Sequence, residues 1–154
     1  MTHAIACERP DGEDARKLIE ELEAELSAIY PSESRHGYSV EKLLSERVAF
    51  FVIRLDGSAA GCGGIQLFGK EYGEVKRMYV RPAFRGLGLG KAMLDHLAGY
   101  ALSRKVGLLR LETGVHQKSA IELYEAFGFH RRAPFGEYKP DPLSAFFEMP
   151  LART

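Results

Sequence analysis

Residues 80–91 read Val-Arg-Pro-Ala-Phe-Arg-Gly-Leu-Gly-Leu-Gly-Lys, so that the end of a strand runs through a glycine-rich turn into a helix. Residues 75–80 are rich in β-branched and aromatic side chains, and Pro82 has no N–H with which to continue a sheet ladder. Glycine permits a backbone with positive φ, and the free N–H groups of a helix N-terminus attract anions. The segment therefore predicts a pyrophosphate site. The helix after it is indicated by apolar residues at helical spacing, namely Leu94, Leu97, Ala98, Ala101 and Leu102.

The spacing of the glycines separates three types of nucleotide site. A P-loop requires four residues between its glycines, followed by Lys and Ser or Thr, whereas Gly86 and Gly90 have three between them and Ala92 follows Lys91. A Rossmann site requires G-x-G-x-x-G, whereas these glycines alternate, and the chain is too short for a six-stranded doubly wound sheet. The third type fits, because residues 85–90 resemble the acyl-CoA loop, (Q/R)-x-x-G-x-(G/A), of the GNAT superfamily of N-acetyltransferases.

A second part of the chain resembles the same superfamily. Residues 111–114 (Leu-Glu-Thr-Gly) precede a segment with the family's A-x-x-L-Y and Gly-Phe pattern, at Ala120, Leu123-Tyr124 and Gly128-Phe129. The resemblance implies that residues 1–154 form a single N-acetyltransferase domain with an α+β fold, a mixed α/β layer sandwich. It implies a central, mostly antiparallel sheet of about seven strands, splayed in the middle to hold the cofactor, and about four helices.

Local patterns predict the individual elements independently of the resemblance. Gly61, Gly63 and Gly64 interrupt one strand and indicate a bulge or the close approach of another backbone. Cys7 and Cys62 are isolated, so we expect small core residues rather than disulfide partners or metal ligands, and no metal site. Strands are predicted at residues 3–8, 48–55, 59–68, 74–80, 108–113, 129–132 and 145–149, and helices that include residues 15–29, 40–44, 94–102 and 120–127.

The composition favours a globular protein that binds a small molecule. Hydrophobic residues make up 45% of the chain and charged residues 27%, and 21 Lys and Arg balance 21 Asp and Glu. Such a balance gives no electrostatic reason to expect a nucleic acid or an anionic membrane as partner. The N-terminus lacks the apolar segment of a secretory signal, and no apolar run approaches the roughly 20 residues of a membrane helix. We therefore expect a cytoplasmic location.

The resemblance implies acetyl-CoA as the cofactor and assigns its contacts. Met78, Tyr79 and Val80 would pair through their backbones with the pantetheine arm and direct an N–H at the acetyl oxygen. Gln117, which stands where many members have asparagine, is expected to contact the cofactor, as are Ala120 and Tyr124. The pyrophosphate would be held by the loop, with charge from its first and last residues: Arg85, Gly86, Leu87, Gly88, Leu89, Gly90 and Lys91.

Acetyl transfer to an amine requires an acid for the departing thiolate and a base for the ammonium. The resemblance implies that Tyr124 is the acid, although its place on the apolar face of a helix also suits a core aromatic. Glu74 matches the position of a catalytic glutamate in histone-acetylating relatives and is the predicted base. The alternatives for Glu74 are a solvent-facing side chain and ordered water as the base.

The resemblance implies that two loops, residues 30–37 and 134–138, border the acceptor, and their His36 and Tyr138 are candidate acceptor contacts. Arg35 or Arg77 could bind a carboxylate through a bidentate pair. We therefore expect direct acetyl transfer, through a tetrahedral intermediate, to the primary amine of an amino acid or other small amino compound. A protein lysine or N-terminus as acceptor, and a non-catalytic acetyl-CoA sensor, are the alternatives. A homodimer would follow if the final strand left Phe146 and Phe147 on an exposed edge.

Overall fold

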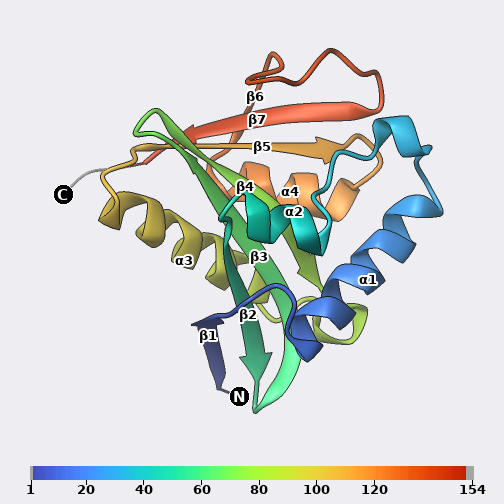
Figure 1. The fold of residues 1–154 in the computed structure, drawn as a ribbon, viewed down its shortest axis with the longest axis vertical. Helices are drawn as coiled ribbons and strands as arrows, with labels where there is room; N and C mark the ends of the chain where they lie inside the picture. The colour runs from blue at the N-terminus through green and yellow to red at the C-terminus, as the bar shows by residue number, and fades with distance from the viewer. Residues whose placement is uncertain (1, 152–154) are drawn as a thin grey trace.

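The computed structural model describes residues 2–151, which form one seven-stranded sheet with helices against it (Figure 1). The predicted α+β fold is confirmed, and the predicted strands and helices all form, with bounds that shift by a few residues. Within the described residues, no helix is long and apolar enough to cross a membrane. The strands are β1 (His3–Cys7), β2 (Ala49–Leu55), β3 (Ser58–Phe68), β4 (Tyr72–Val80), β5 (Leu108–Gly114), β6 (His130–Arg132) and β7 (Ser144–Pro150), and the α-helices are α1 (Glu13–Ser27), α2 (Val40–Ser45), α3 (Leu89–Ser103) and α4 (Lys118–Phe127).

The sheet has the strand order β1-β2-β3-β4-β5-β7-β6 and is antiparallel except where β4 meets β5. This parallel pair is joined at two positions alone, Gly73 opposite Leu109 and Glu74 opposite Arg110. Beyond them β4 continues to Val80 and β5 to Gly114 without pairing to each other. The predicted splay in the middle of the sheet is therefore confirmed.

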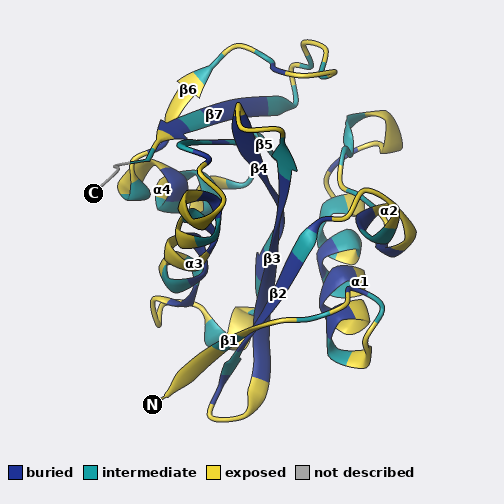
Figure 2. Ribbon diagram, turned by 60° about the vertical axis from the view of Figure 1, so that its left-hand side comes forward, coloured by how far each residue is buried: buried dark blue, intermediate teal, exposed yellow. Residues whose placement is uncertain are grey.

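The helices form two layers, α1 and α2 on one face of the sheet and α3 and α4 on the other (Figure 2). Strand β2 fills both interfaces, because successive side chains of a strand point to opposite faces. Phe50 and Val52 pack with the α1 and α2 layer, and Phe51 and Ile53 pack with α3. A central strand buried on both faces explains why this part of the sequence is apolar without alternation.

The glycines of β3 mark a bulge, as predicted. The register shifts between Cys62 and Gly64, so that the single residue Gly63 opposes both Arg77 and Met78 of β4. A Cβ atom on Gly61 would clash with the carbonyl oxygen of Tyr79, which confirms the close backbone approach. Arg77 has a φ of 54°, the left-handed region that non-glycine residues seldom adopt. The extra residue rotates the end of β4, and Arg77 consequently faces α1.

Two predictions about single residues are wrong. Cys7 lies exposed on the edge strand β1 and is not a core residue, whereas Cys62 is buried as expected. Burial raises the pKa of the Cys62 thiol to about 12, which leaves it protonated and unreactive at neutral pH. Ile29, the last apolar position of the helix predicted at residues 15–29, lies beyond the end of α1 at Ser27 and is 49% exposed.

The final strand is not an edge of the sheet. Strand β7 lies between β5 and β6, and Phe146 and Phe147 are buried. The exposed aromatic edge that would have favoured a homodimer is therefore absent from the described residues, because β6 covers β7.

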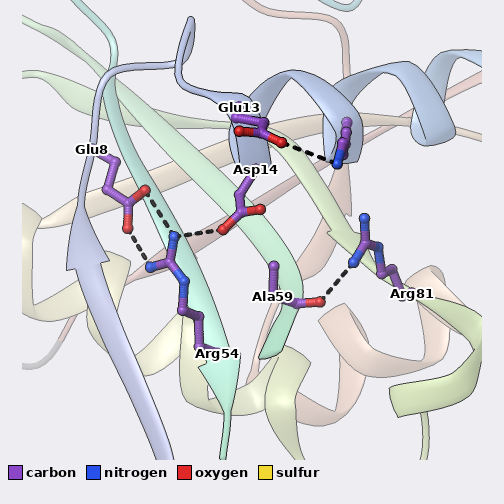
Figure 3. A network of polar contacts seen from close by, with 7 residues as sticks. Glu8, Glu13, Asp14, Arg54, Ala59 and Arg81 are labelled. Atoms are coloured by element: carbon purple, nitrogen blue, oxygen red, sulfur yellow. Dashed lines mark hydrogen bonds and ion pairs between the residues drawn. The ribbon is translucent and has the colours of Figure 1, made fainter. Parts of the chain in front are cut away.

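An arginine cluster fixes the start of the chain to the sheet (Figure 3). Arg54 of β2 donates to both carboxylate oxygens of Glu8, and its Nη2 lies 3.0 Å from Oδ2 of Asp14 at the start of α1. Beside it, Arg81 donates to the carbonyl oxygen of Ala59 at 2.9 Å (Figure 3). These partly exposed pairs add little stability individually, but they set where α1 lies, and α1 lines both cavities described next.

Candidate active site

A cavity of about 570 Å³, here called the large cavity, lies beside the end of β4 and the start of α3. All but one of the residues predicted to contact the cofactor line it. The exception is Leu87, whose side chain is 45% exposed at the tip of the loop. The lining includes Met78, Tyr79, Val80, Arg85, Gly86, Gly88, Leu89, Gly90, Lys91, Gln117, Ala120 and Tyr124.

The glycine loop ends at the N-terminus of α3, as the sequence indicated. Gly86 and Gly88 have φ values of 80° and 79°, which glycine adopts without strain. The first backbone bond of the helix runs from the Ala92 N–H to the Gly88 carbonyl at 3.0 Å. The N–H groups of residues 89–91 precede this bond, and Leu89, Gly90 and Lys91 border the large cavity. They form a site for an anion at the positive end of the helix dipole.

The charges of the large cavity are partly paired. Arg85 donates through Nε to the Val80 carbonyl at 2.9 Å, and its Nη2 lies 3.3 Å from Oε2 of Glu25. Lys91 pairs with Asp95 one turn along α3 at 2.9 Å. Glu25 itself lines the cavity, so an anion bound there would share Arg85 with a carboxylate.

Tyr124 lies where the large cavity meets a second one, because its side chain lines both. The residue is 6% exposed, and its ring packs edge-on against Phe129, with centroids 5.7 Å apart. Burial, together with the nearby charge of Glu112, raises the pKa of the phenol above its ordinary value. Tyr124 is therefore a protonated donor at neutral pH, placed both in the core and at the cavities.

The second, or small, cavity has a volume of about 110 Å³ and lies between the separated ends of β4 and β5. It brings together three of the four predicted substrate residues, Arg35, His36 and Arg77. Tyr138, the fourth, is outside the lining, although its ring lies 5.7 Å from that of His36. The loops containing His36 and Asp141 also meet, with His36 Nε2 3.5 Å from the Asp141 carboxylate.

Glu74 lines neither cavity, so the geometry gives no support to its predicted role as the base. It is 3% exposed, so it does not face solvent either. Its Oε2 lies 2.9 Å from Nζ of Lys76 and accepts a hydrogen bond from the Tyr138 hydroxyl at 2.6 Å. Lys76 also lies 3.9 Å from the centre of the Tyr38 ring. The carboxylate of Glu74 is therefore already paired with a cation and a hydrogen-bond donor of the chain itself.

Glu112, which the sequence analysis did not select, is a glutamate that does border the small cavity. It lies on β5, lines the small cavity, and accepts a hydrogen bond from the Ser144 hydroxyl at 2.8 Å. Desolvation raises the pKa of its carboxyl above the ordinary 4.5. The alternation of side chains along β5 could have identified it. Leu109 and Leu111 pack into the core on the α3 and α4 side, so Glu112, which follows Leu111, must face the opposite side of the sheet.

Tyr30 connects the two ends of the site. Its hydroxyl accepts a hydrogen bond from the His116 N–H at 2.9 Å and donates to Oε1 of Gln117 at 3.3 Å. Its ring stacks on that of His116, with centroids 5.8 Å apart, and a Cβ on Gly114 would clash with it. The segment after α1 is thus anchored to the segment before α4, and Tyr30 forms a wall of the small cavity.

Comparison with known proteins agrees with this geometry. The profile of the Acetyltransferase (GNAT) family matches residues 15–129. The chain belongs to the GNAT family. This GNAT chain is 43% identical over 148 residues to "IAA acetyltransferase" of Azospirillum brasilense, and the match covers 96% of the chain and 97% of that protein. The membership makes it an acyltransferase and confirms the resemblance drawn from the loop and from the A-x-x-L-Y segment.

Solved structures support the same assignment. A Klebsiella pneumoniae protein described as an acyl-CoA N-acyltransferase superposes on this GNAT chain with a TM-score of 0.83 and 37% identity, covering 97% of this chain and 98% of the other. The PaiA N-acetyltransferase of Thermoplasma acidophilum, crystallised with coenzyme A, has the same fold, with a TM-score of 0.76, 20% identity and coverage of 97% and 99%.

Proposed function

We propose that this GNAT protein transfers the acetyl group of acetyl-CoA to the primary amine of a small molecule. One observation carries the proposal: a cavity with an anion site and a cavity with an unpaired carboxylate meet at Met78 and Tyr124. The first suits a nucleotide-bearing thioester, and the second suits an amine. The donor of a proton, Tyr124, stands where the two would react.

The residues of the large cavity fit acetyl-CoA. The volume of about 570 Å³ falls within the range of cofactor sites, roughly 300–1,000 Å³. The N–H groups of residues 89–91 would hold the pyrophosphate, with charge from Arg85 and Lys91, while Met78, Tyr79 and Val80 offer backbone groups beyond the end of the β4–β5 pairing. Gln117 and Ala120 line the cavity from the start of α4. Acetyl-CoA, when bound, supplies the acetyl thioester and a thiol leaving group.

The side chains of the chain supply the proton transfers. An amine with a pKa of about 10 is almost fully protonated at pH 7, so a base must act first. Glu112 would accept the first proton of the ammonium, and the freed nitrogen would bond to the thioester carbonyl carbon to give a tetrahedral intermediate. As the C–S bond breaks, Tyr124 would give its phenolic proton to the sulfur, and the nitrogen would lose its second proton to the Tyr124 phenolate through water, so the products are an amide and a thiol. Solvent would then take the proton of Glu112, which is the one proton that the reaction releases.

The raised pKa of Glu112 suits this assignment, because a base works best when its pKa lies near the working pH. The small volume of its cavity, and the wall formed by Tyr30 and by the His36–Asp141 contact, favour a metabolite over a protein lysine. A protein acceptor and a non-catalytic sensor are outcomes of the test that follows.

The test combines binding with turnover. Calorimetric titration of acetyl-CoA, CoA and NAD should give saturable binding of the first two and none of NAD. Thiol release with a panel of small amines should depend on the amine. Tyr124→Phe should leave acetyl-CoA binding unchanged and lower kcat by about 100-fold or more. Tyr100→Phe, at a partly buried tyrosine of α3 that lines neither cavity, should change neither. Binding without turnover would support the sensor, and acetylation of peptides alone would support a protein acceptor.

A further inference from the structure

One wall of the small cavity has an excess of positive charge. Arg35 and Arg77 both pair with a single carboxylate, Glu23 of α1. Nη1 of Arg35 lies 3.3 Å from Oε2 of Glu23, and Nη2 of Arg77 bonds to the other oxygen. Two guanidinium groups are always charged in a protein, so this cluster has one more positive than negative charge.

Arg77 is already engaged in contacts within the chain. Its side chain is 3% exposed, and Nε donates to the Tyr38 carbonyl at 2.9 Å while Nη2 bonds to Glu23. A Cβ on Gly37 would clash with the guanidinium, so the neighbouring chain closes directly over it. Arg77 therefore holds Glu23 and the bulge of β4 in place.

Arg35 has a different environment. Its Nε is buried and has no hydrogen-bond partner among the described residues, although the side chain as a whole is 27% exposed and lines the small cavity. A buried N–H without an acceptor is costly unless something fills the gap, and a charged donor prefers an anion. Although Nη1 of Arg35 pairs with Glu23, its Nε–H is thus available for a second, anionic partner.

The other wall has the opposite character. Glu112 reaches the same cavity from β5, and its one direct partner among the described residues is the Ser144 hydroxyl. A carboxylate with no ion-pair partner among the described residues, in a cavity of this size, favours an ammonium group as ligand. The charged ends of the cavity therefore match a molecule with a carboxylate at one end and an amine at the other.

We propose that the acceptor is a small amino acid, bound with its carboxylate on Arg35 and its amine beside Glu112. This inference rests on the proposed function and names the substrate class of the same site. The volume of about 110 Å³ is small beside the 570 Å³ of the large cavity, which suits a compact amino acid. An acceptor without the carboxylate would leave the Arg35 N–H unpaired, and enzymes reject such analogues strongly.

The test compares each amino acid of the standard set with its carboxamide as acceptor, in steady-state acetylation with saturating acetyl-CoA. The wild-type protein should prefer at least one acid over its amide by roughly 10- to 100-fold in kcat/KM, the range expected for a charged hydrogen bond. Arg35→Gln should abolish this preference by raising KM for the acid. Arg35→Lys should restore part of the preference, because it keeps the charge but loses the planar fork.

Arg9→Gln is the matched control, since Arg9 is exposed and pairs with Asp11 far from the cavity. It should behave as wild type. Arg35→Gln leaves the pair of Arg77 with Glu23 intact, and thermal unfolding checks that the variant folds. Equal use of acids and amides by the wild type, or an acid preference that survives in Arg35→Gln, would overturn the proposal.

The design separates this inference from the proposed function. Acetylation of amides or simple amines with no preference for acids would reject the amino acid but keep the N-acetyltransferase. Acetyl-CoA binding without acetylation of any member of the panel would also reject the amino acid, because the panel samples the class directly. Absence of acetyl-CoA binding would instead reject the proposed function.

Discussion

The two cavities of this protein are built differently. The large cavity takes most of its anion site from one contiguous segment, residues 85–91, and uses backbone N–H groups at the start of α3. The small cavity takes side chains from α1, the segment after it, β4, β5 and α4, which are far apart in the sequence. Backbone recognition constrains consecutive residues, whereas recognition by side chains constrains positions that meet after folding. The first leaves a readable motif, and the second does not.

The largest expected effect tests whether chemistry depends on the small cavity alone. Glu112→Gln removes the proposed base but keeps the shape and an acceptor for Ser144, so kcat/KM should fall by about 100- to 10,000-fold. Acetyl-CoA affinity, measured by calorimetry, should stay within twofold. Glu125→Gln, on the exposed face of α4, is the control and should be silent.

The pH dependence sharpens the same prediction. The carboxylate of Glu112 is near His36, Glu74 and Lys76 as well as Ser144, and desolvation is the dominant influence that raises its pKa. Activity should therefore be lost, as pH falls, at a higher pH than the ordinary carboxyl value of 4.5. An acidic limb of the profile that persists in the residual activity of Glu112→Gln would refute the assignment.

The converse experiment alters the glycine loop of the large cavity and leaves the small cavity unchanged. Gly88→Ala places a Cβ on a residue with a φ of 79°, and the left-handed region costs a non-glycine residue about 1–2 kcal/mol. Acetyl-CoA affinity should weaken by roughly 5- to 30-fold if the loop shifts to relieve this strain, and the acceptor KM should be unaffected. Gly99→Ala, in open space on α3, should instead raise stability slightly. Unchanged affinity with lowered thermal stability would place the strain in the fold rather than in the binding site.

The Glu112→Gln substitution that lowers activity should raise the stability of the fold. A carboxyl whose pKa is raised on folding binds its proton more tightly in the native state, so stability falls as pH rises from 4.5 to the folded-state value. Glu112→Gln removes this loss, and its unfolding midpoint should exceed that of the wild type by about 2–4 °C at pH 8. The gain should vanish near pH 4, where both proteins are neutral at this position. A constant gain at all pH values would point to packing instead.

The smallest expected effect concerns the charge of the large cavity. Glu25→Gln releases Arg85 from its carboxylate partner, so acetyl-CoA should bind up to about fivefold more tightly. The gain should shrink in high salt, because both groups are partly exposed. Weaker binding would mean that Glu25 orients Arg85 usefully, and the acceptor KM would again be the internal control.

The contrast between the cavities also explains what the sequence could predict. Pro82 and the alternating glycines act through backbone geometry at their own positions, so the strand, turn and helix of residues 80–91 were predicted closely. The left-handed Arg77 and the two-residue bulge opposite Gly63 depend on how β3 and β4 pair, which no local pattern reveals. The resemblance placed the base at Glu74, because it could not show that Lys76 would bury and pair that carboxylate.

The remaining wrong predictions concern apolar residues that the structure leaves exposed. Ile29 follows the helical spacing of α1, but the helix ends at Ser27, and the side chain borders the large cavity instead of the core. An apolar residue exposed in a ligand cavity has the same pattern in the sequence as a core residue. The prediction for Cys7 is wrong for a related reason, since Cys7 is the last residue of β1, which lies at the edge of the sheet.

Two backbone pairings hold β1–β4 to β5–β7, and this has a consequence for amide hydrogen exchange. In most sheets the central strands exchange slowest and the edges fastest. Here the amides that point into the gap beyond Glu74 and Arg110 have no strand opposite them, so exchange should be fast in the middle of the sheet. A ligand bound in the gap between β4 and β5 should slow the exchange of these amides, so that exchange again becomes faster from the central strands toward the edges. The gap is in effect an edge inside the sheet, and the protection of its amides from exchange reports whether a ligand is bound there.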